Sequence, residues 1–563
     1  MRTAPAMPFV GRSTEMSLLS AALDEAVRGR GSVHFVVGEG GVGKTRVVTA
    51  VGELAARKGF ANLLGRSYPV ETGIPYALLA DAFVPLLRSM PASMLQVLAR
   101  GSVSELATLF PALRSEGLAA GDFSEDDVKP RLFDAFARFV QRLAQREPQL
   151  VVLENLHWAD PSSLELLHIL ARGAALHRVV LLCTYDDTRR DAHPTLRATE
   201  RSLQSLDAVH VHHIAPLARE ETLELIERQF GQRSDAVTTF ASRLHDRTQG
   251  NPFFIEEIVN ALVAARCLRE DGGAWSWWDI VELHLPATVR DAISTRLERL
   301  SGDARQVATI AAVVGVQVSH ALLEELAALS PDAFLAAIDT LRDERMFEET
   351  ELEHELAYEF AHPLLREVLY VSLSRARART LHGHVADALE RRYGADWEPH
   401  ADALAIHFLR ADSRAHSMRA CRYLIAAGTS ALDRGANREA DDALRSALDA
   451  CERDGGDVSL LPTVCDLLAR ARQRLGDYVG ATGLWRRALA DPAVAENAPR
   501  VAALERRLGV AAFFSGAYDD AIIHYDRGLI AAGNAADRSV TASLLLARSA
   551  VHLDVGRADH AEA

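Results

Sequence analysis

One short stretch carries the residue types that hold phosphate groups: Gly38-Glu39-Gly40-Gly41-Val42-Gly43-Lys44-Thr45. Its glycines let backbone N–H groups close around phosphate oxygens, and a helix that begins there adds the positive end of its dipole. Lys44 reaches toward the β- and γ-phosphates, and the Thr45 hydroxyl binds Mg²⁺ in such loops. The chain has only three lysines, and one stands where this chemistry requires it. The predicted nucleotide-binding residues here are Gly38, Glu39, Gly40, Gly41, Val42, Gly43, Lys44, Thr45 and Arg46.

The flanking residues fit the setting that a phosphate-binding loop requires. Residues 33–37 form a short β-branched and aromatic run, which favours a strand. Apolar residues then recur at helical spacing, at Val47, Val48, Val51 and Leu54. Strand, glycine loop and helix is the order found around a P-loop, whereas a plain glycine turn before a helix would not need the lysine or the threonine.

A second candidate group ends the apolar run of residues 150–153. Glu154 follows where a buried strand would reach solvent, and ligands of open α/β sheets collect at that end. Behind a P-loop, Glu154 is the expected partner of Thr45 in holding Mg²⁺ and of Lys44 in catalysis. The next residue is Asn155, an amide where a second carboxylate would favour metal-dependent hydrolysis. This replacement bears on whether the chain hydrolyses nucleotide or only binds it.

The segments that follow predict the rest of an α/β core and a helical region behind it. Residues 132–145 are helical in pattern, and apolar runs at residues 178–185 and 208–214 favour two further strands. Residues 286 to about 380, with the hairpin-like residues before them, fit a winged-helix module. The tryptophans of the sequence WSWW, residues 275–278, follow Asp-Gly-Gly, which favours a β-hairpin packed on the core over a ligand cage.

Beyond residue 397 a glycine recurs at intervals of 41, 40 and 40 residues. The glycines are Gly435, Gly476, Gly516 and Gly556, each followed five residues later by Ala440, Ala481, Ala521 or Ala561. A leucine stands thirteen residues after the first three, at Leu448, Leu489 and Leu529. This register predicts helix-hairpin repeats of tetratricopeptide type, rather than a uniform helical bundle. Such solenoids present concave surfaces for a protein or small-molecule inducer, so we expect sensing there.

Composition excludes several other classes of protein. A chain of 563 residues with 48% hydrophobic residues has room for about three to five domains. No apolar run approaches the ~18 residues of a membrane span, and the start lacks a signal-peptide pattern, so we expect a soluble cytoplasmic protein without membrane partners. The net charge of −15 argues against nucleic-acid binding by this chain itself. Five scattered cysteines without a CxxC indicate neither a disulfide framework nor a zinc site.

Several motifs in order resemble the STAND class of P-loop signalling ATPases, and within it the large ATP-binding regulators of the LuxR family. They are FVGRSTEMSLL from Phe9, LHWADPSSLELL from Leu156, QGNPFFIEEIV from Gln249 and FAHPLLREVLY from Phe360. The resemblance implies an AAA+-like parallel sheet at 1–214, a helical lid at 215–270, a winged helix at 271–390 and repeats at 391–563. It also implies that Phe9, Val10 and Pro252 contact adenine, and that His362 bridges the winged helix to the β-phosphate.

Two of these residues have a simpler explanation. Pro252 follows Gly250-Asn251 and could only start a helix, because proline is favoured in the first helical turn. His362 precedes Pro363 and could only mark another helix start. Without the resemblance, a structural histidine would be the better interpretation.

The sequence departs from the resembling family at two positions. Members usually carry a second carboxylate where Asn155 stands and an arginine where Asp186 stands. The first would polarise the attacking water and the second would meet phosphate charge, so we expect slow ATP hydrolysis. Arg189 or Arg190 is a candidate replacement for the missing cation.

The resemblance predicts a switch in which ADP locks the core, lid and winged helix together, while ATP favours an open form that self-associates. The cofactors would be ATP or ADP and Mg²⁺. The repeat pattern breaks off at Ala563, from which we expect a C-terminally truncated fragment whose relatives bind DNA through a further domain. The alternatives are a metabolic NTPase or kinase, and a scaffold in which the nucleotide is structural.

Overall fold

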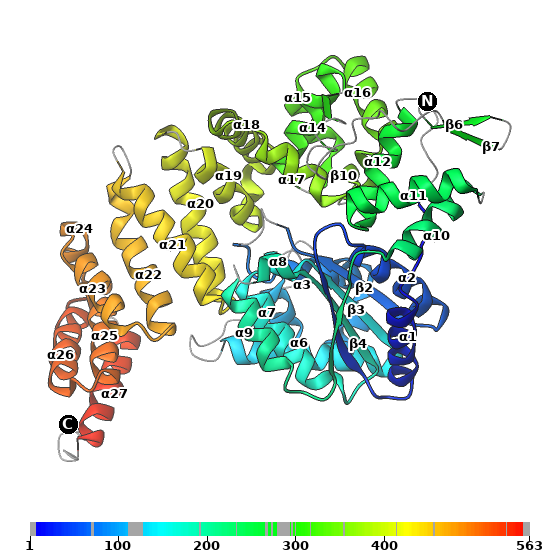
Figure 1. Ribbon diagram of the computed structural model, residues 1–563. Coiled ribbons are helices and arrows are strands. Elements are labelled where there is room, and N and C mark those ends of the chain that lie inside the picture. The colour runs from blue at the N-terminus through cyan, green and yellow to red at the C-terminus, as the bar shows by residue number, and fades with distance from the viewer. Residues whose placement is uncertain are drawn as a thin grey trace. The chain divides into compact units, whose positions relative to one another are not determined.

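The computed structural model (Figure 1) describes most of the chain. The described residues are 7–68, 73–110, 128–190, 193–231, 234–264, 268–271, 274–277, 293, 297, 298, 300–315, 317–352, 355–411, 414–453, 457–535 and 538–555. The chain divides into two compact units, with the main boundary between Arg392 and Tyr393, and residues 73–75 and 128–129 group with the second unit.

A five-stranded parallel sheet forms the centre of the first unit. Its strands are β1 (Ser32–Gly38), β2 (Ala61–Arg66), β3 (Gln149–Glu154), β4 (Val179–Asp186) and β5 (Val209–His213). They pair in the order β2-β3-β4-β1-β5, and every pair is parallel. All residues of β1, β3 and β4 are buried, as expected for a sheet covered on both faces. The predicted α/β core is confirmed.

Helices cover both faces of this sheet. In Figure 1 the strands lie between α1 and α2 on one side and α6, α7 and α9 on the other. The helices of the core are α1 (Ser13–Val27), α2 (Lys44–Arg57), α3 (Ala77–Ser89), α4 (Ala92–Ala99), α5 (Val103–Leu109), α6 (Val128–Arg146), η2 (Leu156–Trp158), α7 (Pro161–Ala174), α8 (Asp187–Arg190) and α9 (Pro194–Leu203). Because the strands are parallel, the carboxyl ends of β1, β3 and β4 share one edge. That edge brings Gly38, Glu154 and Asp186 into one region.

Three helices and a hairpin follow the sheet. They are α10 (Arg219–Phe230), α11 (Asp235–Thr248), α12 (Pro252–Ala264), β6 (Leu268–Asp271) and β7 (Ala274–Trp277). The helices enclose an apolar core that also takes in Met7 and Val10 from the start of the chain. The antiparallel pairing of β6 and β7 confirms the hairpin predicted around Trp275, while Trp278 lies outside the described residues.

The last part of the first unit has the element order of a winged helix. It comprises α14 (Gly302–Val314), β8 (Gln317–Ser319), α15 (His320–Ala327), α16 (Pro331–Asp343), β9 (Phe347–Leu352), β10 (Glu355–Phe360), α17 (Pro363–Val371) and α18 (Arg375–Tyr393). Its three strands are antiparallel in the order β8-β10-β9.

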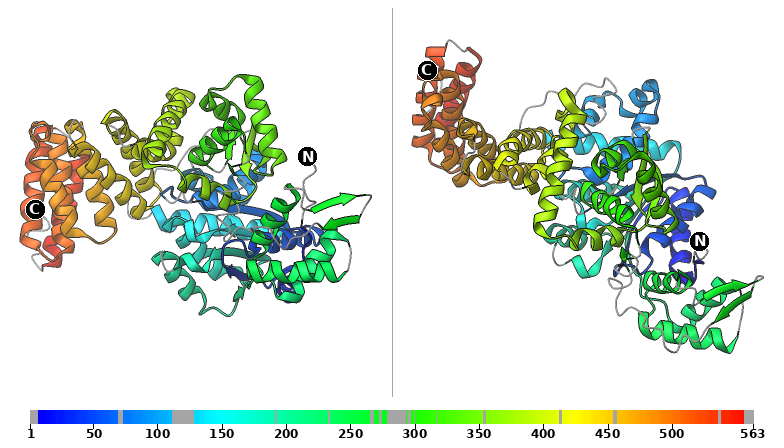
Figure 2. Two further views of the ribbon diagram at one scale, coloured as in Figure 1. Left: turned by 45° about the horizontal axis from the view of Figure 1, so that its top comes forward. Right: turned by 90° about the horizontal axis from the view of Figure 1, so that it is seen from above.

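The second unit is helical, and Figure 2 shows its helices lying side by side in succession. They are η4 (Gly394–Asp396), η5 (Glu398–His400), α19 (Ala401–Ala411), α20 (Arg414–Asp433), α21 (Asn437–Glu452), η6 (Val458–Leu460), α22 (Leu461–Arg474), α23 (Tyr478–Leu489), α24 (Pro492–Ala495), α25 (Ala498–Phe514), α26 (Tyr518–Ala535) and α27 (Arg538–Asp554). Gly435, Gly476 and Gly516 each separate the two helices of a pair and have φ of 69°, 86° and 76°, a backbone conformation that favours glycine. The predicted repeats are confirmed for these three, whereas Gly556 and Ala561 lie outside the described residues. Within the part of the chain that is described, no helix combines the length and the apolar character that crossing a membrane requires.

A glycine fixes the start of α12 against the segment that precedes α10. Gly250 has φ of 77°, and its carbonyl accepts a hydrogen bond from the Leu217 N–H at 2.8 Å. A Cβ at this position would lie 2.0 Å from the Leu217 carbonyl oxygen, which is backbone and cannot rotate away. Gly231 also has a positive φ, 66°, but a Cβ there would meet nothing within 4 Å.

We therefore expect Gly250→Ala to destabilise the first unit more than the matched variant Gly231→Ala. Both replacements carry the cost of a left-handed alanine, about 1 kcal/mol, but only Gly250→Ala must also displace the Leu217 backbone. Thermal unfolding followed by circular dichroism compares the two. Equal midpoints would show that the lid tolerates movement at this contact.

Candidate nucleotide-binding site

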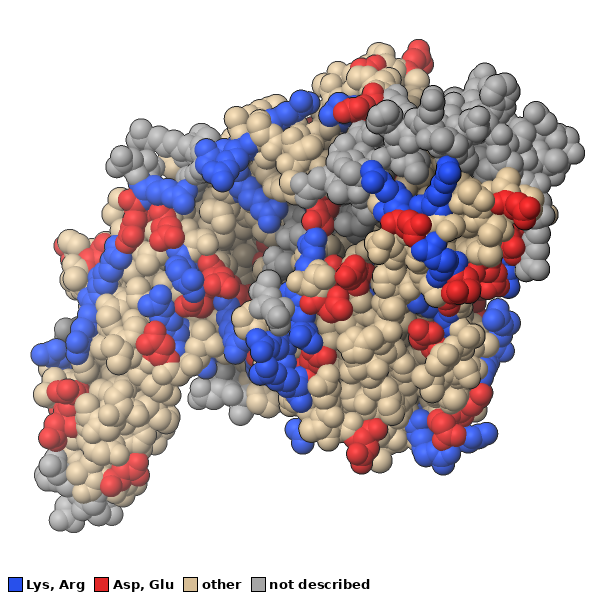
Figure 3. Space-filling model, viewed as in Figure 1, with Lys and Arg blue, Asp and Glu red and all other residues tan. Residues whose placement is uncertain are grey.

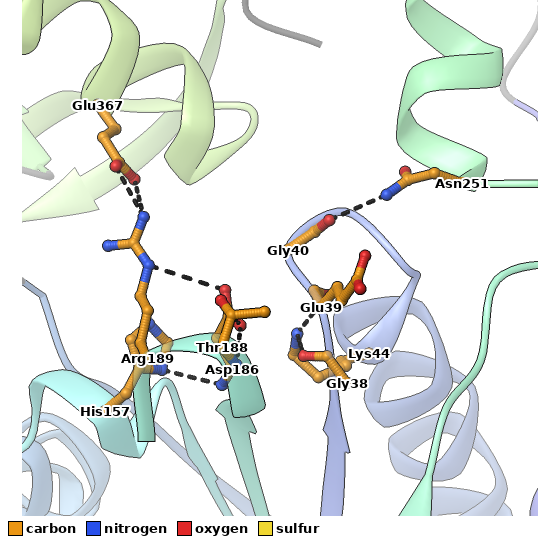
Figure 4. Close-up of polar contacts among 10 residues, drawn as sticks. All are labelled: Gly38, Glu39, Gly40, Lys44, His157, Asp186, Thr188, Arg189, Asn251 and Glu367. Atoms are coloured by element: carbon orange, nitrogen blue, oxygen red, sulfur yellow. Dashed lines mark hydrogen bonds and ion pairs between the residues drawn. The ribbon is translucent and has the colours of Figure 1, made fainter. Parts of the chain in front are cut away.

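The predicted phosphate-binding loop joins β1 to α2. Gly41 and Gly43 have φ of 81° and 100°, so the turn depends on glycine at both positions. The Lys44 ammonium donates hydrogen bonds to the carbonyl oxygens of Gly38 at 2.7 Å and Glu39 at 2.8 Å (Figure 4). Lys44 is the first residue of α2, and its ammonium lies against the backbone at the start of the loop.

Carboxylates surround the Lys44 ammonium. Burial lowers the pKa of Lys44, and the negative charges of Asp186, Asp187, Glu154 and Glu39 oppose that shift. The site therefore holds one lysine cation among several acids. A bound phosphate group would need this cation and the loop N–H groups to offset the nearby negative charge.

Glu154 ends β3 in a buried position, at 2% exposure. Its Oε2 accepts a hydrogen bond from Arg66 Nε at 3.1 Å, whereas its Oε1 is buried without a hydrogen-bond partner among the described residues. An orphaned carboxylate oxygen beside a phosphate-binding loop suits a water of hydrated Mg²⁺, with the Thr45 hydroxyl as second protein ligand. The part of the chain that is described contains no group of three or more metal-binding side chains.

A pocket lies beside the phosphate-binding loop. It brings together Phe9, Val10 and Pro252, the three residues expected at adenine, with Val42, Gly43 and Arg46 of the loop and α2. Its complete lining is Met7, Pro8, Phe9, Val10, Arg12, Val42, Gly43, Arg46, Leu217, Leu225 and Pro252. This mostly apolar lining, which also includes two arginines, suits a planar base next to phosphates.

Two residues that the sequence analysis missed fasten neighbouring segments to the loop. Arg12, buried and left-handed with φ of 66°, donates from Nη2 to the Val42 carbonyl at 3.1 Å. Asn251 donates from Nδ2 to the Gly40 carbonyl at 3.0 Å. A Cβ on Gly41 would lie 2.9 Å from Asn251 Oδ1, so this glycine also makes room for the lid. The position of Asn251 between Gly250 and Pro252 was the available signal.

His362 lies against the lid and near the phosphate-binding loop. Its ring stacks on Phe253 with centroids 4.0 Å apart and an interplanar angle of 21°, and the Phe253 N–H donates to the Gly41 carbonyl at 3.2 Å. Burial, reinforced by the charge of Lys44, lowers the pKa of His362 to about 4. The imidazole is therefore neutral at pH 7, and it would act on a phosphate as an N–H donor rather than as a cation.

Asp186, where the resembling family carries an arginine, ends β4 with its carboxylate already bonded. Its Oδ1 accepts hydrogen bonds from the Thr188 N–H at 3.0 Å and from the Thr188 hydroxyl at 2.7 Å. Its own N–H donates to His157 Nδ1 at 3.2 Å, and burial lowers the pKa of His157 to about 3. Asp186 thus presents negative charge near the loop instead of a cation.

Two arginines, one that ends β2 and one that follows β4, pair with carboxylates of the winged helix. Arg189 donates from Nη2 to both oxygens of Glu367 on α17, at 2.7 and 3.0 Å (Figure 4), and its Nε lies 3.8 Å from Asp186. Arg66 lies between Glu154 and Glu359 of β10, with Nη1 3.7 Å from Glu359. In this arrangement Arg189 does not replace the missing cation, because the winged helix holds it.

Arg190, the other candidate replacement, lies with Nη1 3.9 Å from Glu200 of α9. The structure therefore brings the loop, Glu154, the pocket beside the loop and His362 into one region. It directs both candidate arginines toward protein carboxylates.

Two family models match parts of the chain. Residues 8–182 match the model of a AAA ATPase domain, and residues 218–274 match a domain of unknown function. The first match contains the glycine loop and Glu154, so the chain carries an AAA-type ATPase domain.

Two curated proteins and a solved structure are similar to the chain. An uncharacterized protein of Rhizobium meliloti is 28% identical over 85% of this chain and 46% of its own length. A peroxide stress-activated histidine kinase of Schizosaccharomyces pombe is 22% identical over 68% of this chain and 16% of its own length. The chain thus spans less than half the length of either relative. A Signal Transduction ATPase with Numerous Domains (STAND) protein with a tetratricopeptide repeat sensor from Pyrococcus horikoshii aligns over 99% of this chain and 76% of its own, with 13% identity and a TM-score of 0.43.

We expect Lys44→Ala to weaken ADP and ATP binding at least tenfold, about 1.4 kcal/mol, because it removes the lysine cation at the loop. Lys58→Ala is the matched control, since Lys58 directly follows the same helix and contacts Ser20 and Asp24 instead. Isothermal titration with Mg²⁺ measures both. Parent-like affinity in Lys44→Ala would mean that the loop is not the site.

Proposed function

We propose that the chain is a nucleotide-dependent signalling switch, the ATP- and ADP-binding ATPase and sensor portion of a transcriptional regulator of the LuxR type. One observation carries the proposal. The Phe253 N–H donates a hydrogen bond to the Gly41 carbonyl, and the Phe253 ring stacks on His362. The phosphate-binding loop, the lid and the winged helix therefore meet at Phe253. A ligand at the loop would act on all three parts together.

In this proposal different residues bind the adenine, the phosphates and the Mg²⁺ ion. Phe9, Val10 and Pro252 enclose the adenine, and the loop from Gly38 to Arg46 cradles the phosphates. Lys44 neutralises phosphate charge, while Thr45 and Glu154 hold Mg²⁺ directly or through water. Mg²⁺ would neutralise charge on the phosphates when bound. We assign residues 1–214 to the core, 215–270 to the lid, 271–390 to the winged helix and 391–563 to the sensor.

The winged helix would act as the closing element. Glu367 and Glu359 bond to Arg189 and Arg66, which both rise from the edge of the sheet that faces the phosphates. Arg189 and Glu367 are partly exposed to solvent, so their pairing contributes on the order of 1 kcal/mol or less. Opening the winged helix would release Arg189 from Glu367 toward the nucleotide, while Arg66 would lose Glu359 and keep its hydrogen bond to Glu154. The closed arrangement would therefore favour ADP, and the open arrangement would favour the additional negative charge of ATP.

Slow hydrolysis follows from the same geometry. Asn155 is held left-handed, with φ of 62°, and its N–H donates to the Thr184 hydroxyl at 3.1 Å. An amide cannot accept the proton of an attacking water, and a positioned general base typically contributes ~10² to 10⁴ in rate. Arg189 is meanwhile engaged by Glu367, so the charge developing on the phosphoryl group lacks a cation from β4.

The second unit would receive the signal, since stacked helix pairs present extended surfaces for a protein or small-molecule inducer. In the view of Figure 3, basic and acidic side chains are interspersed over the described surface. With a net charge of −15, this pattern does not favour direct DNA binding, which calls for a basic stripe or patch. DNA contact would therefore require a further domain, and self-association would accompany the ATP state.

Two other functions remain to be separated from this one by experiment. A metabolic NTPase or kinase would turn over ATP at ~1 per second or faster, as enzymes of this kind commonly do. A scaffold with structural nucleotide would release ADP at a rate that does not depend on contacts of the winged helix.

We expect His362→Ala to speed ADP release and to promote self-association, because it removes the ring that joins the winged helix to Phe253. His384→Ala is the control, since His384 is an exposed histidine of α18. Stopped-flow displacement of a fluorescent ADP analogue gives the rates, and light scattering gives the mass. If both variants release ADP at the rate of the parent, His362 has a structural role only. That result would favour a scaffold in which the nucleotide is structural.

We expect Asn155→Asp to raise the rate of ATP hydrolysis, and Asp186→Arg to raise it further in combination. The first change supplies a proton acceptor and the second a cation, and steady-state phosphate release measures both. Asn155→Ser is the control, because it changes the side chain without adding a carboxylate. A parent that already turns over at ~1 per second, or a rate unmoved by either change, would contradict the account of slow hydrolysis.

A further inference from the structure

Two thiols in the second unit lie in direct contact. Cys421 of α20 and Cys451 of α21 have their Sγ atoms 2.7 Å apart, and both are free, buried thiols. A disulfide bond is about 2.05 Å long, so bond formation would bring the two sulfur atoms only ~0.7 Å closer. The two helices are the halves of one hairpin around Gly435, so little backbone movement would be needed.

The position of Cys451 gives this buried pair a route to solvent. Cys451 is the penultimate residue of α21, which ends at Glu452. Terminal helical turns open at a small fraction of the free energy of global unfolding. Cys421 lies within α20, and its Sγ also contacts the Ala447 carbonyl at 3.8 Å. Opening of the last turn of α21 would therefore expose Cys451 while Cys421 stays in place.

The two thiols differ in acidity. The hydrogen bond with Cys421 lowers the pKa of Cys451, although burial and the neighbouring Asp457 and Glu452 oppose this shift. The same hydrogen bond raises the pKa of Cys421. The thiolate is the nucleophile in thiol oxidation. Because Cys451 is the thiol that opening of the last turn of α21 would bring to solvent, Cys451 would react first and Cys421 would resolve the product when the turn closes again.

We propose that Cys421 and Cys451 form a reversible disulfide site that responds to two-electron oxidants such as hydrogen peroxide. The Cys451 thiolate attacks one peroxide oxygen, the O–O bond breaks, and the departing hydroxide takes up a proton as water. The Cys421 thiol then attacks the resulting sulfenic acid, the S–S bond forms, and a second water leaves with the Cys421 proton. Two thiols lose two electrons in total, and one peroxide gains them.

The bond would join α20 to α21 across a 30-residue separation in the sequence and close the first glycine-linked hairpin of the repeats. Cys465 of α22 is a second neighbour of Cys451, and burial raises its pKa. That shift disfavours the Cys465 thiolate, so Cys465 serves as the control residue in the test below. The inference does not depend on nucleotide binding, because all three thiols belong to the second unit.

The test oxidises the full chain with hydrogen peroxide, then alkylates free thiols under denaturing conditions and maps peptides by mass spectrometry. We expect two of the five thiols to be lost in a linked Cys421–Cys451 peptide pair, and dithiothreitol to restore them. Cys421→Ala and Cys451→Ala should each abolish the linkage, whereas Cys465→Ala should keep it. A linkage that includes Cys465 or joins two chains would overturn the assignment.

Equilibration in glutathione buffers separates a slow reaction from an absent one, since it reports the reduction potential rather than the rate. A Cys421–Cys451 disulfide that forms and disappears with the ratio of oxidised to reduced glutathione supports the proposal. Retention of all five alkylatable thiols in oxidised glutathione alone, with no disulfide after prolonged peroxide treatment, would refute it.

Discussion

The hydrogen bonds between the glycine loop and the start of α12 are the contacts on which the arrangement of the first unit depends. The amide of Asn251 binds the Gly40 carbonyl, and the Phe253 N–H binds the Gly41 carbonyl. The lid thus binds the loop through two carbonyl oxygens, and neither bond uses a loop N–H group. The same helix start carries the ring on which His362 stacks. A small shift of the loop therefore reaches the lid and the winged helix through backbone hydrogen bonds and one aromatic contact.

Charge at the sheet edge adds a second constraint. Lys44 is surrounded by acids, while Arg66 and Arg189 are drawn toward Glu359 and Glu367. A ligand shifts a conformational equilibrium only by its difference in affinity for the two states. ADP and ATP differ by one phosphate and its charge, and the placement of two arginines is what would distinguish them. Because Asp186 stands where the resembling family carries an arginine, the positions of Arg66 and Arg189 would have a larger effect on the affinity for nucleotide.

Much of the fold could be predicted from the sequence because its signals are local. β-branched runs mark β1, β3 and β4, and the glycines at 435, 476 and 516 mark the helix pairs. The loop and Glu154 were predicted for the same reason, and their roles stay predictions until nucleotide binding is measured. The pairings of Arg66 with Glu359 and of Cys421 with Cys451 could not be predicted. Each joins residues far apart in the chain, and no short motif marks either partner.

The most direct test of the switch is the nucleotide that the purified chain carries and how fast that nucleotide exchanges. Denaturing extraction followed by chromatography identifies and counts it, and dilution into excess labelled ADP gives the exchange rate. The account predicts bound ADP in near-stoichiometric amount that exchanges slowly in the parent and faster when Glu359 and Glu367 are replaced by glutamine. Nucleotide-free protein, or ADP that exchanges within the mixing time whatever stands at those two positions, would contradict it.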